Sequence, residues 1–255
     1  TSLGKRYLKQ RILFPTRNPE MIRSHWEKIE ILSKNKKDRK KIEESLQEII
    51  DIERVLSRFR GGKASPRDFF GIQKTILSFT SIKQTLDEIG FGFSSLPKEL
   101  QSLHSSLMKC LNEGELPVFL GNSPFLRKGF LEEYDQAMLA KEKGKDWILE
   151  LEEKEKLNSG LSSLKIRYNK ILGYFIEISR AQAKDAPSHF VKKQTLVTGE
   201  RFTSEELEEK ERIILAADEI IERIEKEEFE RLVNLCLSLF PDFLTLATEI
   251  ATLDY

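Results

Sequence analysis

The stretch from Leu164 to Arg180, LKIRYNKILGYFIEISR, determines how this chain must fold. Within it β-branched and aromatic residues alternate with polar ones, and Lys165 and Arg167 lie on either side of Ile166. Alternation with a period of two is typical of a strand with one buried face. Long charged segments with helical periodicity lie before and after it. The predicted fold class is therefore mainly α, with a small antiparallel sheet inserted between helices.

The N-terminal part is predicted to be a series of helices joined by short loops. Asn18 can cap a helix that has Pro19 at its first position, and Ser65 with Pro66 marks the entry to a helix over about 68–90. The segments GGKASPRD and GFGFSSLP are predicted loops because of their glycines and prolines. These helices form the predicted core.

The sheet is predicted to lie at the far end of two long helices that lead out and back. The outgoing helix, near 131–157, has a sparse apolar stripe. A T-x-x-E pattern from Thr203 to Glu206 fits a capping box at the start of the returning helix, which Pro241 should end or kink. The predicted strands lie near 161–168, 171–179 and 190–198.

Composition excludes several classes of protein. A hydrophobic content of 39% over 255 residues is enough for a real core, and 42 basic residues balance 42 acidic ones. Cys110 and Cys236 are far apart and in no metal-binding pattern, so buried free thiols in a reducing compartment are expected. No apolar run approaches the roughly 20 residues that span a bilayer, and no signal peptide begins the sequence. We therefore expect a cytoplasmic protein without a membrane partner.

The neutral total hides a basic segment. Between Leu161 and Gly199 there are seven lysines and arginines against Glu177 and Asp185, whereas the returning helix is rich in glutamate. Lysine, arginine and amide side chains are the groups that meet phosphate oxygens of a nucleic-acid backbone. The alternative is that a small sheet simply places its charges on the solvent face.

Four segments, in order along the chain, resemble the MutS family of mismatch-repair proteins. They are GKRYLKQRILFPTRNPEMI, DIERVLSRFRGGKASPRD, RKGFLEEYD, and SLKIRYNKILGYFIEISRAQAKDAPSHFVKKQTLVTGERFTSEELEEKE with its Y-N-x-x-x-G-Y turn and K-x-Q-T-L run. The resemblance implies a helical core and lever over 1–131, a clamp over 132–197, and a returning lever helix over 198–255. Arg167 departs from the small residue that many relatives have there.

The resemblance also implies a function and partners. In that family two subunits embrace double-stranded DNA, and the clamps contact its backbone without reading bases. It implies a homodimer of the full-length protein, a downstream mismatch-repair partner, and ATP with Mg²⁺ in an ATPase domain that we expect to follow this segment. The residues expected to contact phosphates are Lys165, Arg167, Asn169, Lys170, Arg180, Lys192, Lys193 and Gln194.

No catalytic constellation is evident, and we expect this chain to be no enzyme and to hold no cofactor. Gly61, Gly62 and Lys63 lack the glycine spacing and the hydroxyl of a phosphate-binding loop. The three histidines have no metal-ligand spacing. Two functional hypotheses remain, a DNA-binding fragment and a structural helical arm that docks a partner protein. Which face of the sheet would meet DNA, and which mismatches or junctions the parent handles, stay open.

Overall fold

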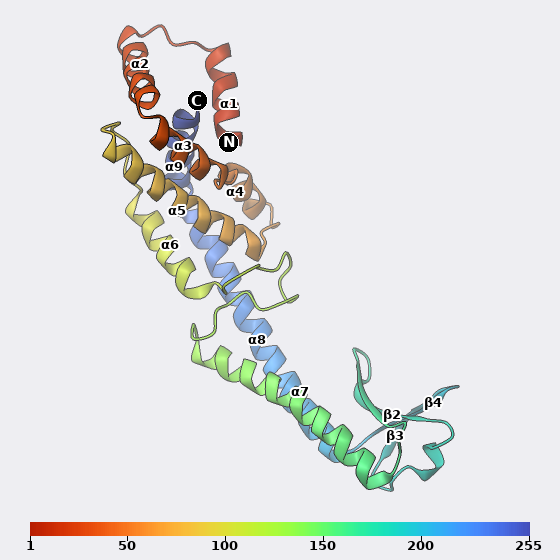
Figure 1. The fold of residues 1–255 in the computed structure, drawn as a ribbon. Helices are drawn as coiled ribbons and strands as arrows, with labels where there is room; N and C mark the ends of the chain where they lie inside the picture. Colours follow the sequence, from red (N-terminus) through yellow and green to blue (C-terminus); the bar gives the residue numbers. More distant parts are fainter. The chain divides into compact units, whose positions relative to one another are not determined.

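The computed structural model describes residues 1–255 and divides into two compact units. We call them the core unit, Thr1–Arg127 with Glu225–Tyr255, and the sheet unit, Lys128–Ile224. The chain is mainly helical with one small antiparallel sheet, which confirms the predicted fold class (Figure 1). The division at 131 and 197 stays a prediction.

The core unit holds most of the helices. They are α1 Ser2–Leu13, α2 Pro19–Lys34, α3 Lys36–Gln47, α4 Ile52–Arg60, α5 Pro66–Glu88, α6 Lys98–Cys110, the last part of α8 Glu205–Ser238, and α9 Phe240–Asp254.

Local sequence signals set several of these helix ends. The side chain of Asn18 accepts hydrogen bonds from the backbone N–H groups of Glu20 (2.9 Å) and Met21 (3.4 Å), as the predicted cap requires. The carboxylate of Asp68 accepts from the backbone N–H of Ser65 at 2.9 Å at the start of α5. α8 and α9 meet at a bend of 63°, which confirms the break expected near Pro241.

The buried side chains of α5 form the centre of the core unit. Phe69, Ile72 and Phe79 are almost completely buried along one face of the helix. The ring of Phe69 packs edge-on against Phe59 and Phe229, with centroids 5.5 Å away in both cases. α5 is therefore the helix around which its neighbours pack.

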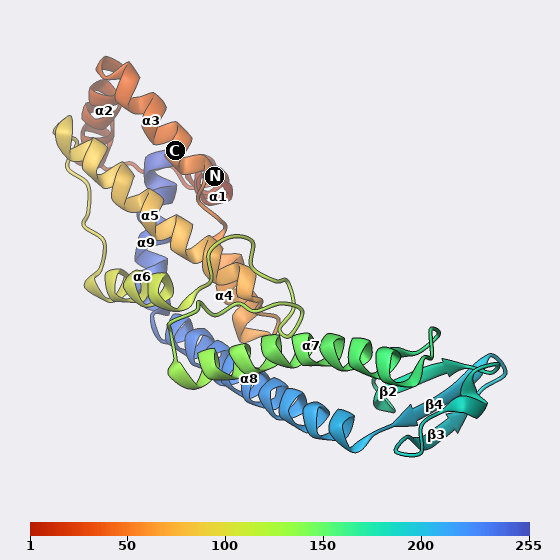
Figure 2. The ribbon, with the colours of Figure 1, turned by 60° about the horizontal axis from the view of Figure 1, so that its bottom comes forward.

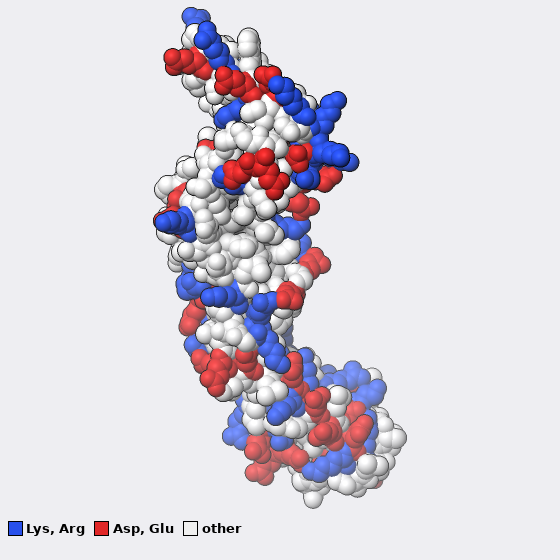
Figure 3. Space-filling view, turned by 60° about the vertical axis from the view of Figure 1, so that its left-hand side comes forward, with Lys and Arg blue, Asp and Glu red and all other residues white.

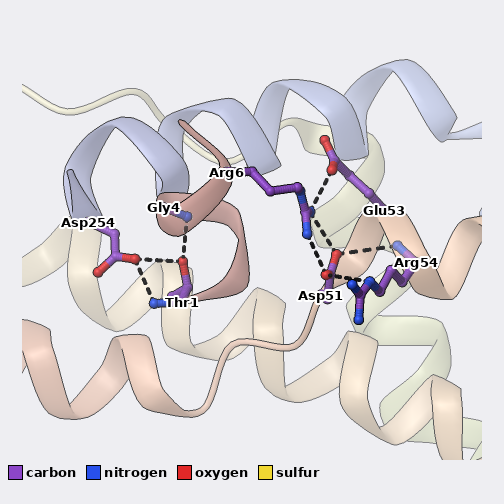
Figure 4. Close-up of polar contacts among 7 residues, drawn as sticks. All are labelled: Thr1, Gly4, Arg6, Asp51, Glu53, Arg54 and Asp254. Atoms are coloured by element: carbon purple, nitrogen blue, oxygen red, sulfur yellow. Dashed lines mark hydrogen bonds and ion pairs between the residues drawn. The ribbon is translucent and has the colours of Figure 1, made fainter. Parts of the chain in front are cut away.

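α1 is tied to the helices beside it by polar contacts (Figure 4). The Thr1 hydroxyl donates to Asp254 in α9 at 2.7 Å. The guanidinium of Arg6 donates to Asp51 at 2.7 Å and to Glu53 at 2.6 Å, at the start of α4. The hydrogen bond from Arg6 lowers the pKa of the Asp51 carboxyl below its ordinary value, although partial burial opposes this.

α2 differs from the prediction in how little of it is buried. Its apolar stripe is present in the sequence, but none of its residues is buried, and Trp26 is 68% exposed. The helix borders a cleft of about 680 Å³ that is also lined by Phe91, Phe93 and Tyr255. Helical periodicity thus identified an amphipathic helix, but it could not show that its apolar face has no covering element.

The sheet unit contains α7 Glu132–Ser159, a four-stranded antiparallel sheet and the first part of α8. The strands are β1 Lys165–Asn169, β2 Gly173–Ser179, β3 Val191–Thr195 and β4 Gly199–Thr203, in the order β1-β2-β4-β3. Figure 2 shows α7 and α8 side by side on their way to the sheet. A short 3₁₀ turn, Ala183–Asp185, lies between β2 and β3.

Two details of the sheet correct the sequence prediction. There are four strands and not three, because 199–203 forms a further strand that pairs with both β2 and β3. The predicted cap at Thr203 is also wrong, since α8 begins at Glu205 and Ser204 accepts the hydrogen bond from the backbone N–H of Leu207 at 3.3 Å. Thr203 ends the fourth strand one residue before the cap position, and its hydroxyl is buried without a hydrogen-bond partner.

No single helix combines the length and apolar character needed to span a membrane, and α8 with α9 meets that test only as a bent pair.

A candidate nucleic-acid interface on the four-stranded sheet

One face of the sheet packs against the two long helices of the sheet unit. Ile166, Ile176 and Phe202 lie opposite one another in register across β1, β2 and β4, so their side chains share a face. That face packs on the ends of α7 and α8. The buried cluster comprises Ile148, Leu151, Leu161, Leu164, Ile176, Ile178, Phe190, Phe202, Leu207 and Ile214, with Ile166 and Tyr174 partly buried against it.

Glutamates of both helices hold the sheet in place. The Glu152 carboxylate in α7 accepts a hydrogen bond from the backbone N–H of Ile166 at 2.7 Å. Glu211 in α8 accepts from the backbone N–H of Tyr174 at 2.8 Å. Gly173 precedes Tyr174 with φ of +72°, and a Cβ at this position would overlap the Glu211 carboxylate. Each helix is thus bonded to one strand of the β1–β2 hairpin.

The opposite face carries a row of charged side chains. Lys165, Glu177, Arg201 and Gln194 lie opposite one another in register across all four strands. The Arg201 Nε lies 3.4 Å from Glu177, and its Nη1 donates to Gln194 at 2.9 Å. The Nε of Arg167, two residues after Lys165, lies 3.7 Å from Oε1 of Glu177, whereas Arg201 approaches Oε2. We call these five residues the outward row; it has three cations and one carboxylate.

The structure distributes the eight predicted contact residues over several places. Lys165, Arg167 and Gln194 belong to the outward row. Lys192 is paired with Glu200 at 2.8 Å, and Lys193 lies 3.8 Å from Glu208 in α8. The remaining three, Asn169, Lys170 and Arg180, are exposed in or next to the turns that follow β1 and β2.

The turn after β1 is built by one of those residues. The Asn169 side chain accepts a hydrogen bond from the backbone N–H of Ile171 at 2.8 Å. This bond leaves the side-chain amide N–H groups of Asn169 as the donors that could meet an anion. Lys170 is exposed beside it.

Sequence reasoning missed Arg201. The predicted sheet ends at residue 198, and this prediction places Arg201 in the approach to a helix. The signal that could have found it is the alternation across 199–203, where Glu200 and Phe202 share one face and Arg201 takes the other. Gly199 hides this signal, because glycine disfavours a strand, yet here it permits close approach to the backbone of Ile178.

Charge on the sheet unit is mixed. On the face drawn in Figure 3, blue and red atoms are interspersed over the part that carries the sheet. Ion pairs within the unit account for this pattern, among them Lys154 with Glu206 at 2.8 Å and Lys141 with Asp218 at 2.5 Å. Any attraction for a polyanion must therefore come from particular unpaired donors.

Comparison with known proteins places this unit in a family. Residues 129–220 match the model of MutS family domain IV. A DNA mismatch repair protein MutS from Leptospira interrogans is 50% identical over 256 residues, which cover all of this chain and 30% of that protein. The chain belongs to the MutS family.

More distant members match along most of the chain as well. MutS from Alkaliphilus metalliredigens is 34% identical over 86% of this chain and 25% of its own length. MutS from Carboxydothermus hydrogenoformans is 30% identical over the whole chain and 31% of its own length. The chain therefore spans less than a third of the curated family members that it matches.

The matched family domain and the compact sheet unit nearly coincide. The match covers 129–220 and the unit covers Lys128–Ile224. The outward row thus lies in the part of the chain that corresponds to domain IV. No group of three or more His, Cys, Asp or Glu side chains is arranged to hold a metal ion.

Proposed function

We propose that this chain is a DNA-binding part of a MutS-type mismatch repair protein. In this proposal the sheet is the clamp that contacts the backbone of double-stranded DNA without reading bases, and α7 and α8 are the levers. The eight residues predicted from the sequence are the candidate contacts. The observation that carries the proposal is the match of 129–220 to domain IV on a unit whose sheet turns cations outward.

The chemistry of the sheet supports backbone contact over base reading. Its available donors are guanidinium, ammonium and amide groups on strands and short turns, and these suit phosphate oxygens. Base reading usually requires an element that enters the major groove. We therefore expect matched and mismatched duplexes to bind equally, at roughly 10⁻⁴ to 10⁻⁶ M at physiological salt.

Fluorescence anisotropy with both duplexes at several salt concentrations tests this proposal. The sheet variant is Lys165→Glu with Lys170→Glu, and the control is Lys36→Glu with Lys37→Glu at the start of α3, an equal change of charge in the core unit. We expect the sheet variant to weaken binding of both duplexes together and to flatten the salt dependence, while the control changes little. An equal loss in both variants, or a loss on the mismatched duplex alone, would contradict the proposal.

The same experiment separates DNA binding from protein docking. If the chain is a structural arm that docks a partner protein, an excess of an acidic protein should displace the duplex. A backbone clamp should retain the duplex under those conditions, because closely spaced phosphates make a denser array of charge than a protein surface does.

Further roles of the longer family members are part of the proposal. We expect residues 1–255 alone neither to bind ATP at micromolar affinity nor to hydrolyse it, and calorimetry with MgATP tests this. ATP and Mg²⁺ would act in another part of the full-length protein. Homodimerisation, a downstream repair partner and a cytoplasmic location are likewise predictions for that protein. Two sheets on one duplex would raise its affinity without new contacts.

A further inference from the structure

Only part of the sheet surface is open to a ligand. The face that carries Ile176 and Phe202 is buried against α7 and α8. A duplex can therefore reach the sheet only through the opposite face, its edges or its turns. The sequence left this choice open.

The opposite face presents a guanidinium group that is already oriented. The Arg201 side chain is held by Glu177 through Nε and by Gln194 through Nη1, and its guanidinium carbon lies 4.3 Å from the centre of the Phe175 ring. Phe175 is only 2% exposed, although it is on the outward face. The remaining nitrogen, Nη2, has no partner in the structure. A guanidinium fixed in this way loses little conformational entropy when it binds an anion.

A second guanidinium group lies beside the first. Arg167 Nε is 3.7 Å from Glu177 Oε1, whereas Arg201 approaches Glu177 Oε2. The Arg167 side chain is 55% exposed. One carboxylate thus bridges two arginines, and both keep unused N–H donors. Arginine donors in a fixed fork match the geometry of phosphate oxygens.

The lysines of β3 are less available. Lys192 lies opposite Phe202, on the same face of the sheet as Ile176, which packs against the helices. It is also paired with Glu200. Lys193 lies at the irregularity of β3 near Glu208. To contact DNA, each lysine would have to break its ion pair. The glutamate that it leaves would then face the negatively charged DNA without a partner.

We infer that Arg167 and Arg201 form the centre of the surface that binds the phosphodiester backbone, and that Glu177 is the residue that positions them. This inference rests on the proposed function and adds to it a face of the sheet and a residue that the sequence did not suggest. DNA lies across the outward row, so the Lys192–Glu200 pair contributes little to its binding.

Three variants test the location of the contact by anisotropy on one duplex at several salt concentrations. Arg201→Lys keeps the charge but removes the fork, and we expect binding about five- to tenfold weaker. Arg167→Gln removes one phosphate contact, so the slope of log affinity against log salt should shrink by about 0.9. The rival contact on β3 is tested by Lys192→Gln with Glu200→Gln, which removes an ion pair without changing net charge, and for DNA lying across the outward row we expect less than about a twofold change.

A matched pair of variants tests the positioning role. Glu177→Gln and Glu177→Ala both remove one negative charge, but only glutamine can still accept hydrogen bonds from the arginines. If Glu177 positions them, the alanine variant should bind DNA about threefold or more weakly than the glutamine variant. Equal affinities would mean that Glu177 acts only through its charge, and the positioning role would be wrong.

The outcomes separate this inference from the proposed function. If the unmodified chain does not bind duplex DNA, both are wrong. If the chain binds DNA, and the Lys192–Glu200 variant loses affinity while both arginine variants do not, the clamp proposal stands and the outward face is wrong. Circular dichroism and thermal unfolding of each variant confirm folding, and Arg167→Gln is the safest variant because its side chain is more than half exposed.

Discussion

Gly144 in α7 gives the sharpest test of how the sheet unit is packed. This residue is buried against Ile214 in α8, and a Cβ built at position 144 would overlap Ile214 Cγ1 and crowd Cδ1. Alanine in place of Gly144 must therefore move one helix or change the conformation of Ile214. The substitution probes the contact between the two helices that lead to the sheet.

Two effects of opposite sign determine the magnitude. Gly→Ala within a helix stabilises by about 1 kcal/mol through propensity alone. Overpacking of a buried contact costs typically about 1–3 kcal/mol. Because Ile214 is only 3% exposed and has little space to move, we expect the second effect to be the larger one. Gly144→Ala should lower the free energy of unfolding by up to about 2 kcal/mol.

A double-mutant cycle with Ile214→Ala shows whether the contact is the cause. The single Ile214→Ala variant should cost about 2–5 kcal/mol, and in the Gly144→Ala background it should cost about 1–3 kcal/mol less, because the new methyl group occupies the vacated volume. Urea unfolding followed by circular dichroism measures all four proteins, with the exposed Lys145→Ala as a control for helix propensity. If Gly144→Ala stabilises the chain and shows no coupling to position 214, the helices do not pack as described.

Three further properties can be measured in the same chain. Gly173→Ala forces a side chain into a left-handed backbone conformation, so it should cost about 1–2 kcal/mol, and retained stability would contradict that turn. Arg6 holds the pKa of Asp51 below its ordinary value, so the stabilisation of the fold by the Arg6–Asp51 pair is present at neutral pH and is lost as pH falls below about 4. The urea midpoints of Asp51→Asn and the unmodified chain should therefore differ at neutral pH and converge in acid, and a difference that persists in acid would refute the pairing. Burial raises the pKa values of the Cys110 and Cys236 thiols to about 12, so both should react with a thiol reagent at pH 8 only as fast as the chain opens, and rapid labelling of the native chain would show that they are exposed.

The sequence predicted the helices and their boundaries well where a local interaction determines them. Asn18 and the pair Ser65–Pro66 mark helix starts through their own side chains or ring geometry, and in the structure α2 begins at Pro19 and α5 at Pro66. The break near Pro241 has the same local origin. These signals need no knowledge of the surrounding fold, and for that reason they can be read from one sequence.

Features that depend on contacts distant in the sequence were not predictable in the same way. The fourth strand lies between β2 and β3. It follows β3 directly in the chain, but its pairing with β2 joins residues as distant in sequence as Ile176 and Phe202. Its start, at Gly199, has low strand propensity. The unburied stripe of α2 has a similar explanation, since amphipathic periodicity reveals a face but not the element that would cover it.

The charge of the sheet shows why a count of residues is not enough to locate a binding surface. The segment from Leu161 to Gly199 has seven cations against two acids, which suggests a uniformly basic tip. Glutamates outside the segment change this: Glu200 and Glu208 approach the β3 lysines, while Glu177 inside it bridges two arginines. An ion pair in solvent is worth about 0–1 kcal/mol, so these contacts add little stability. Their effect is to fix where free N–H donors point, and on this sheet the donors held in the best-defined orientation lie on the face away from the helices.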